Sequence, residues 1–69
     1  MEIIYSHHAQ LRMLERAITR EHVEKVLDSP DVLLESSDGK TKASKRLGDK
    51  VYGVVFIKEA DKIIVVTVF

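Results

Sequence analysis

The sequence predicts an α+β domain in which two N-terminal helices pack on a twisted antiparallel sheet of three or four strands. Residues 6–28 combine helix-capping residues with apolar residues at helical spacing, which predicts the helices. Residues 32–69 are rich in β-branched residues and contain glycine-bearing turns, which predicts the sheet. A chain of 69 residues has room for one domain, so we assign residues 1–69 to a single domain with a thin core.

The first expected element is Glu2–Tyr5, a short β-favouring segment that we interpret as an edge strand or an extended arm. Ser6 fits the N-cap of a first helix, because its hydroxyl can accept a hydrogen bond from an amide of the first turn. We expect this helix to end near Arg16 or Ala17.

Thr19 fits the N-cap of a second helix. Ile18 precedes this cap and Val23 follows at the fourth helical position, which is the spacing of a hydrophobic staple that sets the angle between the two helices. Pro30 disfavours helical geometry in the residue before it, so we expect the second helix to stop near Asp28.

Four segments of the C-terminal half favour strands, and turn residues separate them. The Asp-Gly pair is the strongest part of the signal for the first of these turns. The expected strands are Val32–Leu34, Thr41–Leu47, Val51–Ile57 and Ile63–Phe69, with turns at Ser36–Gly39, Gly48–Asp49 and Glu59–Lys62.

The last two expected strands are apolar at nearly every position. An antiparallel sheet with one wet face alternates apolar and polar residues, and two short helices can cover only one face. We therefore infer that a partner covers the second face, either a second copy of the chain or another protein. The alternative is a curled sheet that buries both faces by itself.

Composition narrows the functional classes. Eleven basic and eleven acidic residues give a formal net charge of zero, so the overall charge does not indicate a nucleic-acid partner. A local basic excess lies at Lys40, Lys42, Lys45, Arg46 and Lys50. The sequence has no cysteine, no signal-peptide pattern and no apolar run near the roughly 18 residues of a membrane span. We therefore expect a cytoplasmic protein without a membrane partner.

The histidines and glycines match no known metal-site or phosphate-loop pattern. His7 and His8 are neighbours about 100° apart on a helix and cannot easily share an ion. His22 brings no carboxylate–histidine spacing of a known metal type, and the three glycines form no phosphate loop. We therefore expect no metal and no cofactor.

The best candidate for a functional site is a polar stripe on the first helix. Each residue of a helix advances by about 100°, which places the residues of the stripe on one side. The stripe consists of His8, Arg12, Glu15 and Arg16. Its apolar flanks are Leu11, Leu14 and Ile18 on one side and Ala9 and Met13 on the other. A solvated face normally lies opposite the apolar side, so we expect the stripe to point into a groove or against the protein body.

The stripe suits phosphodiester chemistry. His8 can act as an acid or a base near neutral pH. Arg12, one turn further on, can bind a phosphate with two parallel hydrogen bonds and stabilise an anionic transition state. The alternative is a structural network in which Glu15 pairs with Arg12 or Arg16 and His8 caps it.

The expected sheet supplies further candidates. Lys45 and Arg46 point to opposite faces of a strand, so only one of them can face the helix stripe and contact a phosphate. The alternative for both is a solvated edge that discourages aggregation. The Thr67 hydroxyl can bond a substrate phosphate or orient His8, unless it is satisfied locally. Tyr52 can orient a substrate group or serve as a half-buried core aromatic.

Two parts of the sequence resemble a known family. They are the run Tyr5-Ser6-x-His8-Ala9-x-x-Arg12-Met13-x-Glu15-Arg16-x-Ile18 and the ending Val66-Thr67-Val68-Phe69. Both resemble domain of unknown function 4258, a small bacterial and archaeal family whose pattern also has a second helix, a proline-containing break and a strand-rich tail. The family commonly has Gly at the position of Ala17, where Gly suits the left-handed turn that closes a helix.

The resemblance implies an architecture similar to that of small toxin ribonucleases of the RelE and barnase-like group. Those proteins cut RNA without a metal, using His, Arg and Lys side chains against the phosphate. The motif residues here are charged, whereas a motif that served packing alone would be mostly apolar. The resemblance therefore favours a site at His8 and Arg12.

Two functional hypotheses follow. In the first, the protein is a metal-independent ribonuclease-like toxin module in which a ribose 2′-hydroxyl attacks and leaves a cyclic phosphate, and its partners are RNA and an antitoxin or a second copy. The residues assigned to this activity are His8 and Arg12 as catalytic groups and Arg16, Lys45, Arg46 and Thr67 as substrate-binding groups. In the second, the protein is a non-catalytic interaction module, and the helix stripe is a structural ion-pair network.

Overall fold

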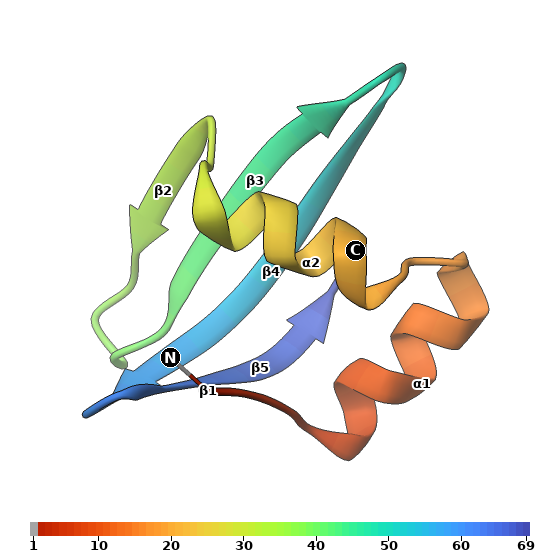
Figure 1. Cartoon of the computed structure of the whole chain (residues 1–69). Helices are drawn as coiled ribbons and strands as arrows, with labels where there is room; N and C mark the ends of the chain where they lie inside the picture. The colour runs from red at the N-terminus through yellow and green to blue at the C-terminus, as the bar shows by residue number, and fades with distance from the viewer. Residues whose placement is uncertain (1) are drawn as a thin grey trace.

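The computed structural model describes residues 2–69, which form two helices and a five-stranded mixed sheet (Figure 1). The strand order is β1-β5-β4-β3-β2. Both helices contribute to a core on one face of the sheet, α2 against β3 and β4 and α1 against β5. The elements in chain order are β1 (Glu2–Tyr5), α1 (His7–Arg16), α2 (Arg20–Asp28), β2 (Val32–Glu35), β3 (Thr41–Leu47), β4 (Lys50–Glu59) and β5 (Lys62–Val68).

The predicted fold class is wrong in its sheet. The sheet has five strands rather than three or four, and it is mixed because β1 runs parallel to β5, with Ile3 beside Ile63 and Tyr5 beside Val65. The other neighbouring strands are antiparallel. The segment Glu2–Tyr5 is the edge strand that its composition allows, but its local sequence holds no information about a partner at the other end of the chain.

Ser6 fixes the start of α1 and joins it to the sheet. Its Oγ accepts a hydrogen bond from the Ala9 amide at 3.0 Å and donates one to the Val66 carbonyl at 2.8 Å. At the other end of α1, Ala17 takes the left-handed conformation, with φ 56° and ψ 38°. The turn that glycine favours therefore forms with alanine, at a cost of about 1–2 kcal/mol for an L residue.

The predicted limits of α2 are confirmed. The Thr19 hydroxyl accepts from the His22 amide at 3.1 Å and His22 Nδ1 accepts from the Thr19 amide at 3.1 Å, which completes a capping box. The helix ends at Asp28, two residues before Pro30. The His22 ring also stacks on Tyr52 of β4, with ring centroids 4.6 Å apart, so one side chain caps the helix and fastens it to the sheet.

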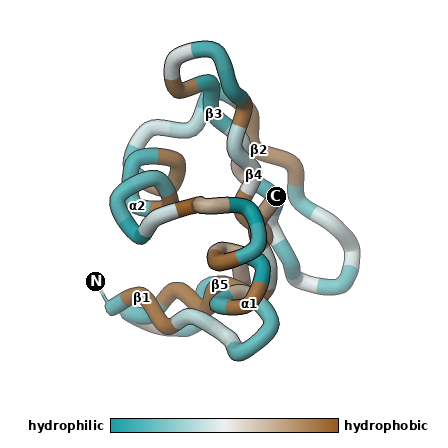
Figure 2. Tube along the Cα trace, turned by 90° about the vertical axis from the view of Figure 1, so that its right-hand side faces the viewer, coloured by the Kyte–Doolittle hydropathy of each residue, from teal (hydrophilic) through white to brown (hydrophobic). Residues whose placement is uncertain are grey.

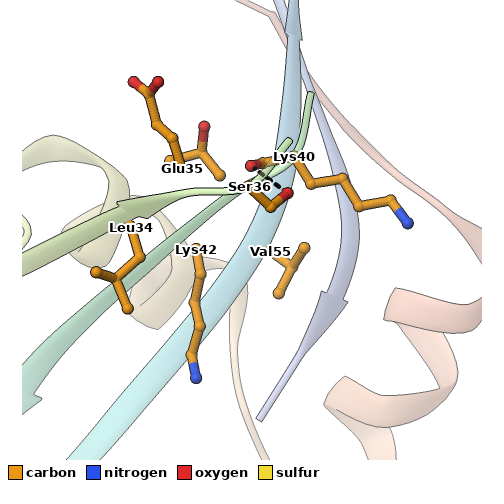
Figure 3. A pocket seen from close by; sticks show the side chains of 7 residues that line it. Leu34, Glu35, Ser36, Lys40, Lys42 and Val55 are labelled. Atoms are coloured by element: carbon orange, nitrogen blue, oxygen red, sulfur yellow. Dashed lines mark hydrogen bonds between the residues drawn. The ribbon is translucent and has the colours of Figure 1, made fainter. Parts of the chain in front are cut away.

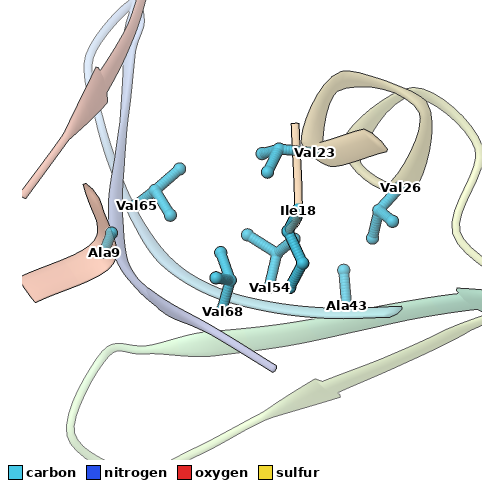
Figure 4. Close-up of a cluster of buried hydrophobic side chains, with 8 residues drawn as sticks. All are labelled: Ala9, Ile18, Val23, Val26, Ala43, Val54, Val65 and Val68. Atoms are coloured by element: carbon cyan, nitrogen blue, oxygen red, sulfur yellow. The ribbon is translucent and has the colours of Figure 1, made fainter. Parts of the chain in front are cut away.

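A small core lies between the helices and one face of the sheet (Figure 4). Its buried side chains are Ala9, Ile18, Val23, Val26, Ala43, Val54, Val65 and Val68. All are alanine or β-branched, so the two layers approach closely, and no charged side chain of residues 2–69 is fully buried. So thin a core leaves little margin for substitutions in it.

The opposite face of the sheet carries apolar side chains that the helices leave uncovered. Side chains alternate along a strand, so Val55 lies on the face opposite its buried neighbour Val54. Ile4, Leu34 and Val51 are exposed on this outer face. Figure 2 shows hydrophobic stretches along β1 and β2, whereas β3 is largely hydrophilic. A partner on this face stays a prediction.

Candidate functional site

The orientation of α1 decides where its polar stripe points. Ala9 is fully buried against the sheet, and Met13, one turn further on, packs on the core. Leu11 and Leu14 lie on the far side of the helix, 48% and 80% exposed. The expected apolar flank of leucines is therefore wrong, because the small side chain of Ala9 sets the inward face of α1.

The three cations of the stripe lie on the same side of Ala9 but differ in exposure. Arg12 and Arg16 lie about 60° and 20° around the helix from Ala9, and His8 lies about 100° from it. Arg12 is half-buried, whereas His8 and Arg16, near the two ends of the helix, are exposed. We call His8, Arg12 and Arg16 the α1 ridge. It runs along the edge of the helix–sheet contact rather than into it.

Arg12 has the most constrained side chain of the ridge. It is 32% exposed, and its Nη1 lies 4.0 Å from Glu15 Oε1. Its Nε is buried and has no hydrogen-bond partner among residues 2–69. An ion pair of this length on the surface contributes little, so the guanidinium retains donors that are available to an added acceptor.

His8 has an open environment. Its imidazole makes no hydrogen bond or ion pair within the part of the chain that the structure describes. Positions four apart on a helix have Cβ atoms about 5–6 Å apart, so the imidazole and the Arg12 guanidinium are neighbours. The structural network that the sequence allows is thus reduced to one long Arg12–Glu15 pair.

The ridge leads to a hollow of about 320 Å³ at the end of the sheet. Its charged lining residues, Arg16 and Lys50, are both cations, and aromatic rings line it as well. The full lining is Arg16, Ile18, Lys50, Val51, Tyr52 and Phe69. Two neighbouring cations are suited to a phosphate group.

The aromatic part of this hollow is firmly supported. Phe69 lies across Gly53 of β4, and a Cβ added to Gly53 would meet the Phe69 ring at 2.5 Å. The Lys42 ammonium sits 4.4 Å from the centroid of the Phe69 ring, and His22 stacks on Tyr52. A glycine inside a strand often marks a close approach of this kind, so Gly53 is a signal that could have indicated this contact, which the expectations from the sequence did not include.

Lys45 and Arg46 lie away from the α1 ridge. Lys45 Nζ donates to the Ser29 carbonyl at 2.8 Å and lies 3.6 Å from Asp31 Oδ1, which holds it at the end of α2. Arg46 is exposed and its Nε donates to the Gly48 carbonyl at 3.1 Å. Both side chains therefore tie local loops, and neither is placed beside His8.

Thr67 lies on the other side of the sheet from the core. It is half-buried on β5 opposite Val55, and it alternates with the buried Val68. Its hydroxyl is thus on the outer face, whereas the α1 ridge borders the helix-covered face. Of the candidates from the sequence, the structure brings together His8, Arg12 and Arg16.

The clearest pKa shifts lie outside the ridge. A hydrogen bond from the Arg46 amide lowers the pKa of Asp31, helped by the Lys45 charge. A hydrogen bond from the Ser36 hydroxyl lowers the pKa of Asp38. Burial raises the pKa of Tyr5, chiefly by desolvation. These shifts belong to turns and to the helix–sheet contact.

Comparison with known proteins identifies the family. The family described as "Domain of unknown function (DUF4258)" matches residues 5–69. The chain belongs to this family. No match to a curated protein or to a solved structure was found. Neither of the helices formed by residues 2–69 is long and apolar enough to cross a membrane.

Proposed function

We propose that this protein is a metal-independent ribonuclease-like module that binds RNA phosphodiesters along the α1 ridge. The observation that carries the proposal is the pairing of an exposed His8 with Arg12 one turn further along α1, where the Arg12 side chain is 32% exposed and its only ion pair among residues 2–69, to Glu15, is 4.0 Å long. A phosphate oxygen would accept charge-assisted hydrogen bonds from the Nη groups of Arg12, so the site favours an anion.

In the proposed reaction, the ribose 2′-oxygen attacks the adjacent phosphorus and the bond to the 5′-oxygen breaks. The products are a 2′,3′-cyclic phosphate and a 5′-hydroxyl. His8 takes the proton from the 2′-hydroxyl or delivers one to the leaving 5′-oxygen, and water performs the other transfer. Arg12 stabilises the charge that develops on the phosphoryl oxygens.

The hollow beyond the ridge supplies the binding energy for the rest of the RNA. Arg16 and Lys50 hold neighbouring phosphates, a contribution that falls as salt concentration rises. Tyr52 and Phe69 also line the hollow and add apolar contact area for the nucleotide. Lys50 takes the role that the sequence suggested for one of Lys45 and Arg46, because the Lys45 ammonium is engaged by Ser29 and Asp31 and Arg46 Nε donates to the Gly48 carbonyl.

The biological role proposed here is that of a toxin. The comparison with RelE and barnase-like ribonucleases rests on two small helices packed on one face of a sheet, and it is an analogy of architecture rather than of site. A ribonuclease that acts on cellular RNA would work in the cytoplasm and arrest growth. It would then need a partner that restrains it, such as an antitoxin.

The test is cleavage of a 5′-labelled RNA by purified protein in the presence of a metal chelator. We expect fragments that end in a cyclic phosphate, and no cut where the attacking nucleotide is 2′-deoxy. His8→Ala should lower the rate by about 10²–10⁴-fold. The matched control is His7→Ala, since His7 is also exposed on α1 but lies about 100° away around the helix.

Two results would count against this function. One is RNA left intact at high protein concentration, together with normal growth of cells that express the protein. The other is an equal loss of activity in His7→Ala and His8→Ala. If Arg12→Ala and His8→Ala lower stability and change no activity, the chain is instead a non-catalytic interaction module, which its exposed Leu11 and Leu14 also suit.

A further inference from the structure

The edge strand β2 is unusually open for a soluble protein. All four of its residues are exposed, and Val32, Leu33 and Leu34 are 49%, 56% and 59% exposed. Sheet edges are normally protected by charged residues, proline, a bulge, short strand length or a covering element. β2 has no lysine or proline, its one charged residue is Glu35 at its end, and β3 is its neighbour on one side only.

The hydrogen bonds of β2 show which groups are free at this edge. The Ser36 amide donates to the Lys40 carbonyl at 2.9 Å, and the antiparallel register pairs Leu34 with Lys42. Bonded and non-bonded pairs alternate in such a ladder. The main-chain groups of Leu34 thus turn toward β3, whereas those of Leu33 and Glu35 point outward.

We propose that β2 pairs antiparallel with β2 of a second copy about a two-fold axis, which makes one continuous ten-stranded sheet. The outward main-chain N–H and C=O groups of Leu33 then form hydrogen bonds with those of Glu35 in the other copy, and Glu35 does the same with Leu33 of that copy. Leu34 faces Leu34 across the axis in a pair without direct hydrogen bonds, where Cα atoms are about 4.5 Å apart and side chains are closest. The strand therefore serves as its own partner.

Charge selects this register over the neighbouring ones. A shift that places Leu33 opposite Leu33 also places Asp31 opposite Glu35 at both ends. The opposite shift places Glu35 opposite Glu35. Like charges directly across a strand pair are destabilising, whereas the proposed register sets Glu35 beside Leu33 and Ser36 beside Val32. A second copy fits the edge without opposed charges.

The side chains also fit. Val32 and Leu34 lie on the outer face, and the two-fold axis keeps this face on the same side in both copies, so four apolar side chains gather at the axis. Leu34 lines a hollow of about 270 Å³ together with Lys42 and Val55 (Figure 3). The space beside Leu34 is thus open on the face where the other copy adds its side chains.

The size of the contact predicts a dimer that dissociates on dilution. Stable interfaces bury about 1,600 Å² in total, and pairing of two four-residue strands buries less. We therefore expect sedimentation equilibrium to show a dimer that grows with protein concentration. Leu34→Lys should remain monomeric at the same concentrations and keep the same circular dichroism spectrum, because this side chain is exposed.

A cross-link tests the register itself. The chain has no cysteine, so a single Leu34→Cys is the only thiol in the protein. At about 4.5 Å between Cα atoms, two such residues fit the range for a disulfide, and we expect a covalent dimer on mild oxidation. Leu33→Cys should link poorly, because Leu33 residues of the two copies lie about 7–8 Å apart on the diagonal.

The controls decide the outcome. Leu14→Cys, on the exposed side of α1, should form no more cross-linked dimer than random collision gives. A dimer with a dissociation constant of about 1 mM is only weakly bound. A wild-type chain that stays monomeric up to that concentration overturns the proposal. Faster linking of Leu33→Cys than of Leu34→Cys overturns it too. Neither readout involves RNA, so this inference stands or falls separately from the proposed activity.

Discussion

The two helices are nearly equal in length, but the protein uses them differently. α2 has nine residues, buries Val23 and Val26, and lies across β3 and β4. α1 has ten residues, buries Ala9 alone, and lies against β5 with Leu14 turned to the solvent. Packing therefore accounts for the sequence of α2, and it accounts for much less of the sequence of α1.

The charges of the two helices differ in the same sense. α2 carries an ordinary surface pair, with Lys25 Nζ 3.9 Å from Glu21 Oε1 on exposed side chains. α1 instead places Arg12 at the border of its contact with the sheet and leaves its Nε buried and without an acceptor among the residues described. A helix selected only for packing would carry an apolar side chain there. Packing alone therefore does not account for the charged residues of α1.

The largest effect that tests this comparison is truncation on α2. Val26→Ala removes two methyl groups from a fully buried site, so it should lower the free energy of unfolding by about 2 kcal/mol. Leu14→Ala removes more atoms from α1, yet we expect a change within about 0.5 kcal/mol. Urea denaturation measures both. Equal losses would mean that the outer side of α1 is buried in solution, which would break the comparison.

A smaller effect concerns the end of α1. Ala17→Gly should raise the free energy of unfolding by about 1 kcal/mol, because glycine adopts the left-handed conformation of this residue without strain. Ala9→Gly, the matched change inside the same helix, should lower it by about 1 kcal/mol. Thermal or urea unfolding of the pair gives the sign directly. A loss in both variants would show that the turn after α1 is not strained.

Local signals in the sequence were sufficient for the helices and insufficient for the sheet. Thr19 and Pro30 mark the two ends of α2 by capping chemistry and backbone restriction, which act within a few residues. The parallel pairing of β1 with β5 depends on residues at opposite ends of the chain, and nothing within Glu2–Tyr5 encodes it. Pairing of distant strands is decided by the whole packed structure.

The sequence predicted which residues of the candidate site lie on the same side of α1, but not which side of α1 faces the sheet. Helical geometry correctly grouped His8, Arg12 and Arg16 on one ridge. The stripe was expected to point inward because apolar residues flank it on both sides, whereas the inward face of α1 is centred on the small side chain of Ala9. The hollow at Arg16 depends on Phe69 folding over Gly53, a tertiary contact for which the interior glycine was the one local sign.

The smallest predicted effect concerns the segment that leaves α2, which a carboxylate ties to β3. Asp31 accepts a hydrogen bond from the Arg46 amide at 2.8 Å, and this bond lowers its pKa in the folded protein. The contribution of this hydrogen bond to the free energy of unfolding is therefore complete above the ordinary aspartate pKa of about 3.9 and is lost as the pH falls through the lowered value.

We expect the stability of the wild type to fall more steeply below about pH 4 than that of Asp31→Asn. Asp49→Asn, an exposed aspartate whose side chain makes no hydrogen bond within residues 2–69, should keep the wild-type slope. Urea titrations between about pH 2 and pH 6 measure the slopes, and identical slopes for all three proteins would show that this tie does not hold the end of α2.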